Sequence, residues 1–384
     1  MPESIPFQSL APFASLKDPR RDHPTKLHPL FEILSLTLLA SLSGAENWAE
    51  IELWSEANQD WLQQFFPLEN GIPSHDTFSR VFALLDPEPL AAAFLAWSSQ
   101  ISTHIQGVVA FDGKTVRRSL DRPDGKGPIH VVSAFAVDNR VVLAQLKVDD
   151  KTNEITALPQ LIRLLDLSGC TATIDAMGCQ VECAQAIRDQ KGDYMLCIKE
   201  NQPTLYTEVK ELFDHALKPN LPKDQSIAYV ESVDVDKGHG RIEQRRCIGI
   251  EDLQGLSSIL RWPGAKSVWM IESKREVLGV GESVEKRYYL GSLVARVAED
   301  ARRGNETVRS HWGIENSVHW VLDMALGEDW NRARVGHSAE NLSLVRKIVL
   351  NIVKQDKKLK VGVKARLKRA GWDKSYLLHL LTLC

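Results

Sequence analysis

The order of short apolar runs between residues 107 and 199 is the feature that most constrains the fold of this chain. Three runs there have the length and composition of buried strands, and a further segment is typical of a β-hairpin that turns at Asp138–Asn139. Segments with helical periodicity separate the later strands. The region is therefore predicted to form a mixed α/β core. Its segments, in chain order, are GVVAFDGKT, HVVSAFAVDNRVVLAQLKV, EITALPQLIRLLDL, CTATIDAM, QVECAQAIRDQKG and DYMLCIKEN.

Helical patterns precede this core, and a β-rich segment follows it. Residues 1–100 are predicted to be all-helical, and the turn at Gly71–Pro73 before a short helix fits either a DNA-reading helix-turn-helix or ordinary helical packing. Four strand-like runs predict an antiparallel β insertion at residues 201–295. The expected organisation is a helical, DNA-binding N-terminal domain (1–100), a catalytic core (101–200 and 296–350), the insertion (201–295) and a basic C-terminal tail (351–384).

The net charge of −3 disfavours a nucleic-acid binder by itself, but the charge is unevenly distributed. From Arg332 to the C-terminus there are 13 Lys and Arg against 3 Asp and Glu, a net +10, so the preceding residues carry −13. The segment QDKKLKVGVKARLKRAGWDKSY is basic and partly amphipathic, which is typical of segments that bind phosphate backbones. A solvated helix face would give the same pattern.

The sequence indicates neither export nor a membrane span. Residues 1–13 lack the basic start and apolar run of a signal peptide. The most apolar segment, residues 27–48, contains Glu32 and is predicted to be a buried helix. Six scattered cysteines without paired CxxC units indicate reduced thiols, so we expect a cytoplasmic protein with no membrane partner.

Three acidic residues have positions that favour metal chemistry. Asp112 and Asp175 each follow a short apolar run of the predicted core, where α/β sheets gather catalytic groups, and Glu315 lies on the helix after the β insertion. Converging carboxylates bind Mg²⁺ or Mn²⁺, and two such ions roughly 3.5–4 Å apart can act on a phosphodiester. Taken singly, each Asp is more often a turn former and the Glu an exposed helix residue. Their joint order on this core is that of RNase-H-like nucleases.

Residues 309–330 are predicted to form a helix with a polar stripe at its apolar edge. His311, Glu315, His319 and Asp323 are four residues apart and therefore lie along one face. Charged groups are costly there unless they are paired, bind a metal or face a wet cleft, so we expect the stripe to face a catalytic cleft. The spacing is not that of zinc proteases, and packing of the histidines against the neighbouring tryptophans is favoured over metal ligation.

Several blocks of the chain resemble the ISAs-type transposases, the DDE transposases of bacterial insertion sequences that are also called H-repeat-associated proteins. The resemblance covers nearly the whole chain and implies an α/β fold, an RNase-H-like catalytic core with an antiparallel β-strand insertion, preceded by an all-helical N-terminal domain. The blocks are HPLFEILSLTLLASLSGAENWAEIELW, GIPSHDTFSRVFALLDP, FDGKTVRRS, TIDAMGCQ, YMLCIKENQPTL, KGHGRIEQRR, YYLGSL and RSHWGIENSVHWVLDMALGEDWNRAR.

The same resemblance implies that Asp112, Asp175 and Glu315 are the catalytic, metal-binding triad, with Mg²⁺ as cofactor and Mn²⁺ as a substitute. Asp112 would bridge two ions and the other two acids would hold one each. Cleavage at the ends of the insertion sequence would free a 3′-OH that attacks target DNA. The implied partners are double-stranded DNA, at the terminal inverted repeats and the target, and a second copy of the chain in a dimer on DNA at the bacterial nucleoid. The wider superfamily has Arg and Lys where this chain has His311 and Leu322, so those two roles are not transferred.

Residues around the triad are expected to contact DNA or to position the Glu. Six basic residues could bind the phosphates of the scissile strand, although basic side chains there could equally serve solubility. Three polar residues after the Glu could orient it or bound water. The basic residues are Lys114, Arg117, Arg118, Arg302, Arg303 and Arg309, and the polar ones are Asn316, His319 and Asp323.

Two other functions compete with this interpretation. FDGKT is similar to the Asp-Gly-x-Thr motif of haloacid-dehalogenase-like phosphatases, but Ala110 occupies the position of their nucleophilic Asp. The second alternative is a catalytically inactive or domesticated transposase that binds DNA without cutting it. The presence of all three acids speaks against loss of activity.

Overall fold

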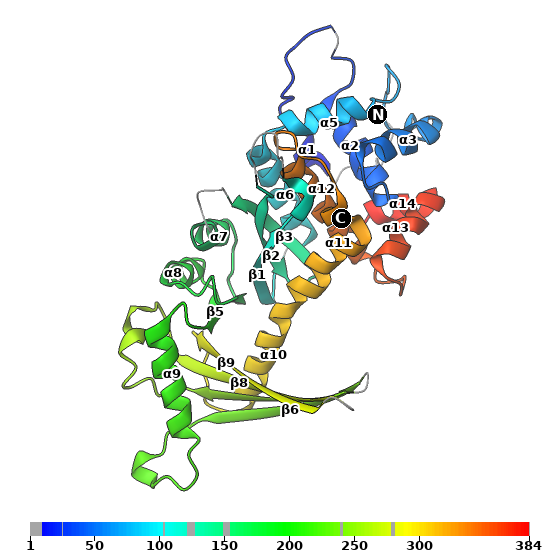
Figure 1. Ribbon diagram of the computed structural model, residues 1–384. Helices are drawn as coiled ribbons and strands as arrows, with labels where there is room; N and C mark the ends of the chain where they lie inside the picture. The colour runs from blue at the N-terminus through cyan, green and yellow to red at the C-terminus, as the bar shows by residue number, and fades with distance from the viewer. Residues whose placement is uncertain are drawn as a thin grey trace.

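The structure, a computed structural model, describes residues 10–24, 26–102, 104–120, 127–148, 154–238, 241–277 and 281–383 (Figure 1). The first nine residues, part of the segment without signal-peptide features, lie outside these ranges. A nine-stranded sheet runs through the molecule in the order β3-β2-β1-β4-β5-β9-β8-β7-β6. The strands are β1 (Gly107–Thr115), β2 (His130–Ala136), β3 (Val141–Val148), β4 (Cys170–Ile174), β5 (Asp193–Ile198), β6 (Val230–Gly238), β7 (Arg241–Ile250), β8 (Ser267–Val277) and β9 (Gly281–Gly291).

The first five strands form the core that the sequence predicts. The β2–β3 hairpin pairs antiparallel to β1, whereas β4 is parallel to β1 and β5 is parallel to β4. Alternate residues of β1 face opposite sides of the sheet, with Val109 and Phe111 in one apolar cluster and Ala110 in another. Helices α7 (Glu154–Arg163) and α8 (Val181–Asp189) contribute apolar residues to the first cluster. The predicted α/β fold with an RNase-H-like core is confirmed.

The four strands of the insertion extend the same sheet. Strand β9 pairs antiparallel with β5, and β8, β7 and β6 follow outward. Helix α9 (Pro203–Ala216) precedes them, and the long helix α10 (Ala298–Ile314) packs on the sheet after them (Figure 1). The approach of α10 is close because Gly304 lies against the ring of Trp269, where an added Cβ would come within 2.8 Å. The insertion therefore continues the sheet of the core and is covered by the helix that leads to Glu315.

The N-terminal and C-terminal helices share one apolar cluster beside the core. The apolar run near the N-terminus forms α2, which is buried on nearly all sides. The short helix after the predicted turn, α5, buries Phe78, Val81 and Phe82 in this cluster. The remaining helices are α1 (Ala11–Ala14), α2 (Leu30–Leu42), α3 (Trp48–Ala57), α4 (Gln59–Leu62), α5 (His75–Leu84), α6 (Pro87–Ile101), α11 (Trp320–Leu326), α12 (Ser338–Gln355), α13 (Val363–Trp372) and α14 (Lys374–Leu381).

Among the helices of the described ranges, none is by itself both long and apolar enough to cross a membrane. The pair α5 and α6, bent by 92°, passes that test only when its two helices are taken together.

Candidate active site

Strand β1 presents Asp112 and Lys114 on the same face as Ala110, because side chains two residues apart share a face of a sheet. This is the face that α10 and α11 cover. The strand does not end at Asp112, as its apolar run suggests, but continues to Thr115. The acid therefore lies within the part of the strand that pairs with β2, where Ser133 is its register partner.

Asp175 directly follows β4, the strand next to β1. Phe111 and Ile174 are partners in the parallel register, so the two aspartates follow them at matching positions on neighbouring strands, which are about 4.8 Å apart. The backbone N–H of Gly178 donates to Asp175 Oδ1 at 3.2 Å and fixes that carboxylate. The sheet thus juxtaposes two acids that are 63 positions apart in the sequence.

Glu315 lies where the helix that begins as α10 changes its winding. The sequence predicts one regular helix, but residues Glu315–His319 form a π-helical turn between α10 and α11. Such turns insert one extra residue into a helix and are frequent at functional sites. The extra residue rotates the following helix, on which Asp323 faces Lys114. Within the turn, the side chain of His319 reaches back to Glu315.

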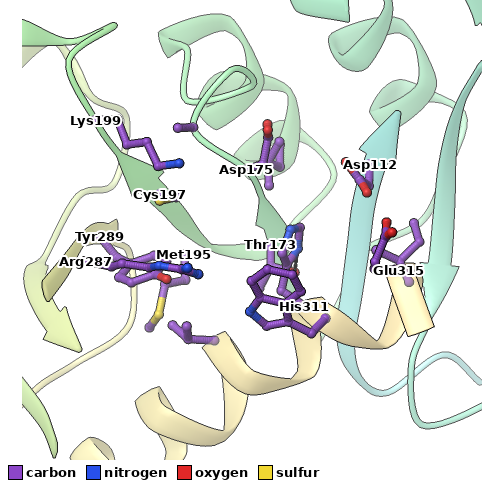
Figure 2. Close-up of a pocket in the computed structure, with 15 residues that line it drawn as sticks. Asp112, Thr173, Asp175, Met195, Cys197, Lys199, Arg287, Tyr289, His311 and Glu315 are labelled. Carbon is purple, nitrogen blue, oxygen red and sulfur yellow. Dashed lines mark hydrogen bonds between the residues drawn. The ribbon is translucent and has the colours of Figure 1, made fainter. Parts of the chain in front are cut away.

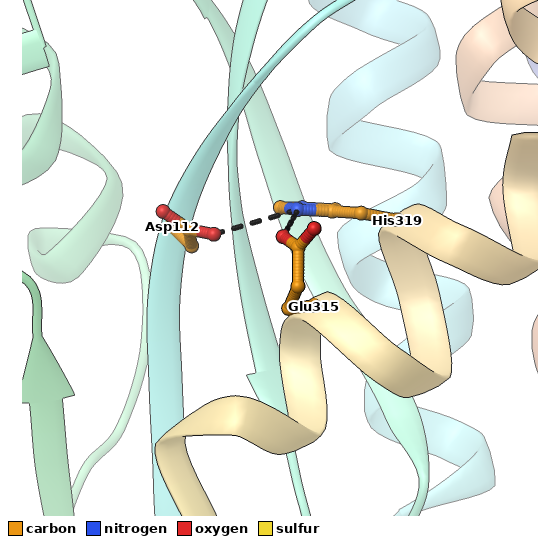
Figure 3. A group of neighbouring side chains, drawn as sticks. All are labelled: Asp112, Glu315 and His319. Carbon is orange, nitrogen blue, oxygen red and sulfur yellow. Dashed lines mark hydrogen bonds and ion pairs between the residues drawn. The ribbon is translucent and has the colours of Figure 1, made fainter. Parts of the chain in front are cut away.

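Asp112, Asp175 and Glu315 line one pocket, with the two aspartates on the sheet and the glutamate on the helix opposite (Figure 2). His319 joins Asp112 and Glu315 (Figure 3), and its Nδ1 lies 3.1 Å from Glu315 Oε2 and 3.4 Å from Asp112 Oδ2. One ligand atom from each of these three residues lies within 4.8 Å of the others. Asp175 borders the pocket without belonging to that compact group.

The electrostatics of this group leave its negative charge uncompensated. Burial, and then the charge of Asp175, raises the pKa of Asp112 to about 7. Burial lowers the pKa of His319 to about 4, so its imidazole is uncharged at neutral pH and contributes no counter-charge. Carboxylate oxygens around a shared pocket are the donors that Mg²⁺ and Mn²⁺ prefer, and a bound cation would supply the missing charge. The residues therefore fit a divalent cation.

Lys114 and Asp323, predicted to contact DNA and to orient Glu315, bind each other instead. Lys114 Nζ lies 2.7 Å from Asp323 Oδ1, 3.2 Å from Glu328 Oε2 and 3.4 Å from Asp329 Oδ1. The Lys114 side chain is only 8% exposed, and the three carboxylates around it stabilise its charge inside the protein. These four residues, named the Lys114 cluster below, adjoin the acid pocket without lining it.

Most of the other predicted residues lie at the surface, away from the acids. Arg117 is 82% exposed and pairs with Asp329, while Arg118 stacks on the ring of Trp330 at 4.2 Å. Of the residues on α10 and the π-helical turn that were predicted to contact DNA or to orient Glu315, only His319 lies among the acids. Arg302 pairs with Glu299 and Glu306, Arg309 pairs with Asp236, and Arg303 and Asn316 are exposed. His311 lines the pocket, with its Nδ1 3.1 Å from Thr173 Oγ1.

Two cationic residues of the pocket were missed by sequence reasoning. Lys199 follows β5 and Arg287 lies on β9, and both line the pocket beside the acids. Lys199 could have been found, because it follows a predicted strand just as Asp175 does. Arg287 could not, since its place depends on the pairing of β9 with β5, which joins segments about 90 residues apart.

Comparison with known proteins agrees with this architecture. Residues 10–98 match the DDE_Tnp_1-associated family model, and residues 103–352 match the transposase DDE domain. The chain is 38% identical over 360 residues to the H repeat-associated putative transposase YhhI of Escherichia coli K12, covering 92% of each chain. It is 37% identical over 382 residues to the putative transposase YncI of Escherichia coli O157:H7, covering 98% of this chain and 95% of the relative. Two family models and two near-full-length relatives therefore agree that the chain belongs to the DDE transposase family.

Proposed function

We propose that this protein is an active DNA transposase, which cleaves phosphodiester bonds at the ends of an insertion sequence and transfers the freed 3′-OH into target DNA. The observation that carries the proposal is the shared pocket of Asp112, Asp175 and Glu315. Each acid comes from a different element, and the sheet and helix hold them rigidly enough for metal chemistry.

The carboxylates of Asp112, Asp175 and Glu315 would hold Mg²⁺, with Mn²⁺ as a substitute. When bound, such ions lower the pKa of water and stabilise the leaving oxygen of a phosphodiester. His319 orients Glu315 because its Nδ1 lies at hydrogen-bond distance from Oε2 and its ring is nearly buried. The Gly178 N–H holds the Asp175 carboxylate in the same way.

The proposed reaction has two balanced steps. Water attacks phosphorus at the element end, the bond from phosphorus to the 3′ oxygen breaks, and the water oxygen stays on the 5′-phosphate while the 3′ oxygen takes up a proton. The new 3′-OH then attacks a phosphodiester of target DNA. In that step the attacking 3′ oxygen bonds to the target phosphorus and gives up its proton, while the bond from that phosphorus to the target strand's own 3′ oxygen breaks and the released oxygen takes up a proton. One phosphorus–oxygen bond forms and one breaks, so the step needs no further energy source.

Double-stranded DNA is the proposed partner, at both the terminal inverted repeats and the target. Five arginines outside the pocket would bind the DNA phosphates, because their contacts within the protein lie at its surface, whereas Lys114 is buried among three acids. Pairing two ends for joint cleavage implies a dimer on DNA. The five arginines are the exposed Arg117, Arg302, Arg303 and Arg309 and the half-buried Arg118.

A plasmid-nicking assay tests the proposal. Supercoiled plasmid that carries the DNA flanking the coding region is incubated with Mg²⁺ and the wild-type chain, the Asp175→Ala variant or the Asp189→Ala variant. Wild type and Asp189→Ala, whose acid lies on the surface of α8, are expected to nick the plasmid, and Asp175→Ala is expected to lose nicking. Nicking by Asp175→Ala would remove that acid from the mechanism. Binding without nicking by wild type would favour the inactive, DNA-binding alternative.

A further inference from the structure

The pocket has a basic half opposite its acids. Lys199, just after β5, and Arg287, on β9, direct their side chains into it from the side of the inserted strands (Figure 2). The Cys197 thiol lies between them. Burial raises the pKa of this thiol to about 11, and the charges of Lys199 and Arg287 both oppose that rise. The two side chains therefore share one wall of the pocket.

The protein supplies little negative charge to this wall. Among the described residues, no acid lies within ion-pair distance of Lys199 Nζ. Of the acids in the described part of the chain, Arg287 pairs only with Glu285, a neighbour on its own strand whose side chain is 60% exposed, and such pairs contribute little. The Arg287 guanidinium also lies over the ring of Trp312, 5.4 Å from its centroid, which fixes its orientation.

A third cation continues this wall across the inserted strands. Arg245 of β7 is half-buried, and its Nε has no hydrogen-bond partner within the described ranges. Burial lowers the pKa of Arg245, and the charges of Arg309 and Arg287 act in the same direction, whereas Tyr289 and Glu243 oppose them. Guanidinium groups that repel one another are costly to the fold, and a phosphate bound near them would relieve that cost.

We propose that Lys199, Arg287 and Arg245 form a phosphate-binding track for the DNA strand that extends from the acid pocket across the inserted strands. The inference rests on the proposed function, because it takes DNA as the ligand. Strand β7 lies two strands beyond β9, and Arg245 is level with Glu285, two residues from Arg287, so the backbones of the two arginines are roughly 12 Å apart and their side chains contact different phosphates. Guanidinium groups suit this task because their donors match phosphate oxygens in pairs. The contacts are to the backbone and therefore independent of sequence.

The salt dependence of DNA binding tests the track without any catalysis. A short fluorescein-labelled duplex of arbitrary sequence is titrated by anisotropy at several salt concentrations, with EDTA present. Each lost phosphate contact is expected to lower the slope of log K against log salt by about 0.9 and to weaken binding roughly tenfold at low salt. Lys199→Ala, Arg245→Ala and Arg287→Ala are each expected to show this loss. Arg287→Lys is expected to keep the slope, because it keeps the charge.

Arg296→Ala is the matched control, since Arg296 is 70% exposed and paired with Glu251 away from the pocket. Its slope is expected to equal that of wild type. Wild-type slopes in Lys199→Ala and Arg287→Ala would overturn the track, as would an equal loss in Arg296→Ala. Lys199 is exposed, so Lys199→Ala is expected to fold and to give a salt slope even if a substitution at half-buried Arg245 prevents folding. Wild-type nicking with Mg²⁺ alongside unchanged slopes would leave the proposed function intact and refute the track alone.

Discussion

Asp112 and Lys114 lie two residues apart on the same face of β1, but the protein compensates their charges differently. Around Lys114 it supplies both signs, with three carboxylates within 3.4 Å of one ammonium and two further cations, Arg346 and Lys347, acting on buried Glu328. Around Asp112 it supplies three more acids, Asp175, Glu154 and Glu315, and an uncharged imidazole. Acids whose counter-charge lies within the protein serve the fold, and acids without one are available to an external cation.

The largest effect on stability is expected from breaking the Lys114 cluster. Lys114→Met leaves Glu328, which is fully buried, without its nearest cation, so unfolding in urea should show a loss of about 3–5 kcal/mol. Arg117→Met is the control, because Arg117 is exposed and its pair with Asp329 should contribute less than about 0.5 kcal/mol. A Lys114→Met protein as stable as Arg117→Met would show that this cluster is not a structural unit.

A smaller effect is expected from Mn²⁺, which should stabilise only through the acid pocket. At a concentration of about 100 Kd, a ligand that binds only the folded state adds about 2.7 kcal/mol, measured as a rise in the thermal unfolding temperature. Glu315→Gln should lose most of this gain, because it removes an acid of the compact group. Asp323→Asn should keep it, because Asp323 pairs with Lys114. An equal loss of Mn²⁺ stabilisation in both variants would contradict the distinction between the acid pocket and the Lys114 cluster.

The same comparison shows how far the sequence predicts the site. Strand ends and helical spacing were sufficient to select the three acids, because short apolar runs and a four-residue period are local features. The pairing of Asp323 with Lys114, away from the other acids, was not predictable. It follows from a π-helical turn, and the sequence pattern there is that of a regular helix. Lys114 has the composition of a DNA contact and becomes a buried ion only when Glu328 folds against β1. Local patterns thus selected the acids, whereas the partner of each charge depends on tertiary packing.

The smallest effect is expected in the pH dependence of the metal-free protein. The pKa of Asp112 is raised from its usual 3.8 to about 7, so the folded state binds this proton more tightly than the unfolded state does. Stability should therefore fall as the pH rises from 3.8 toward 7 and stay lower above that range. Asp112→Asn cannot lose this proton, and above pH 7 it should be more stable than wild type, by on the order of 1 kcal/mol after allowance for partial exposure.

The comparison of wild type with Asp112→Asn in urea at a series of pH values measures this effect. His319 works in the opposite direction, because burial lowers its pKa to about 4 and stability is lost as the pH falls below its usual value of 6.5. Both proteins contain that histidine, so their difference above pH 6.5 reports on Asp112. Saturating Mn²⁺ should remove the advantage of the variant, since the cation then compensates the carboxylate in wild type. A variant that is less stable than wild type above pH 7 without metal would mean that the protein itself compensates Asp112, as it does Glu328.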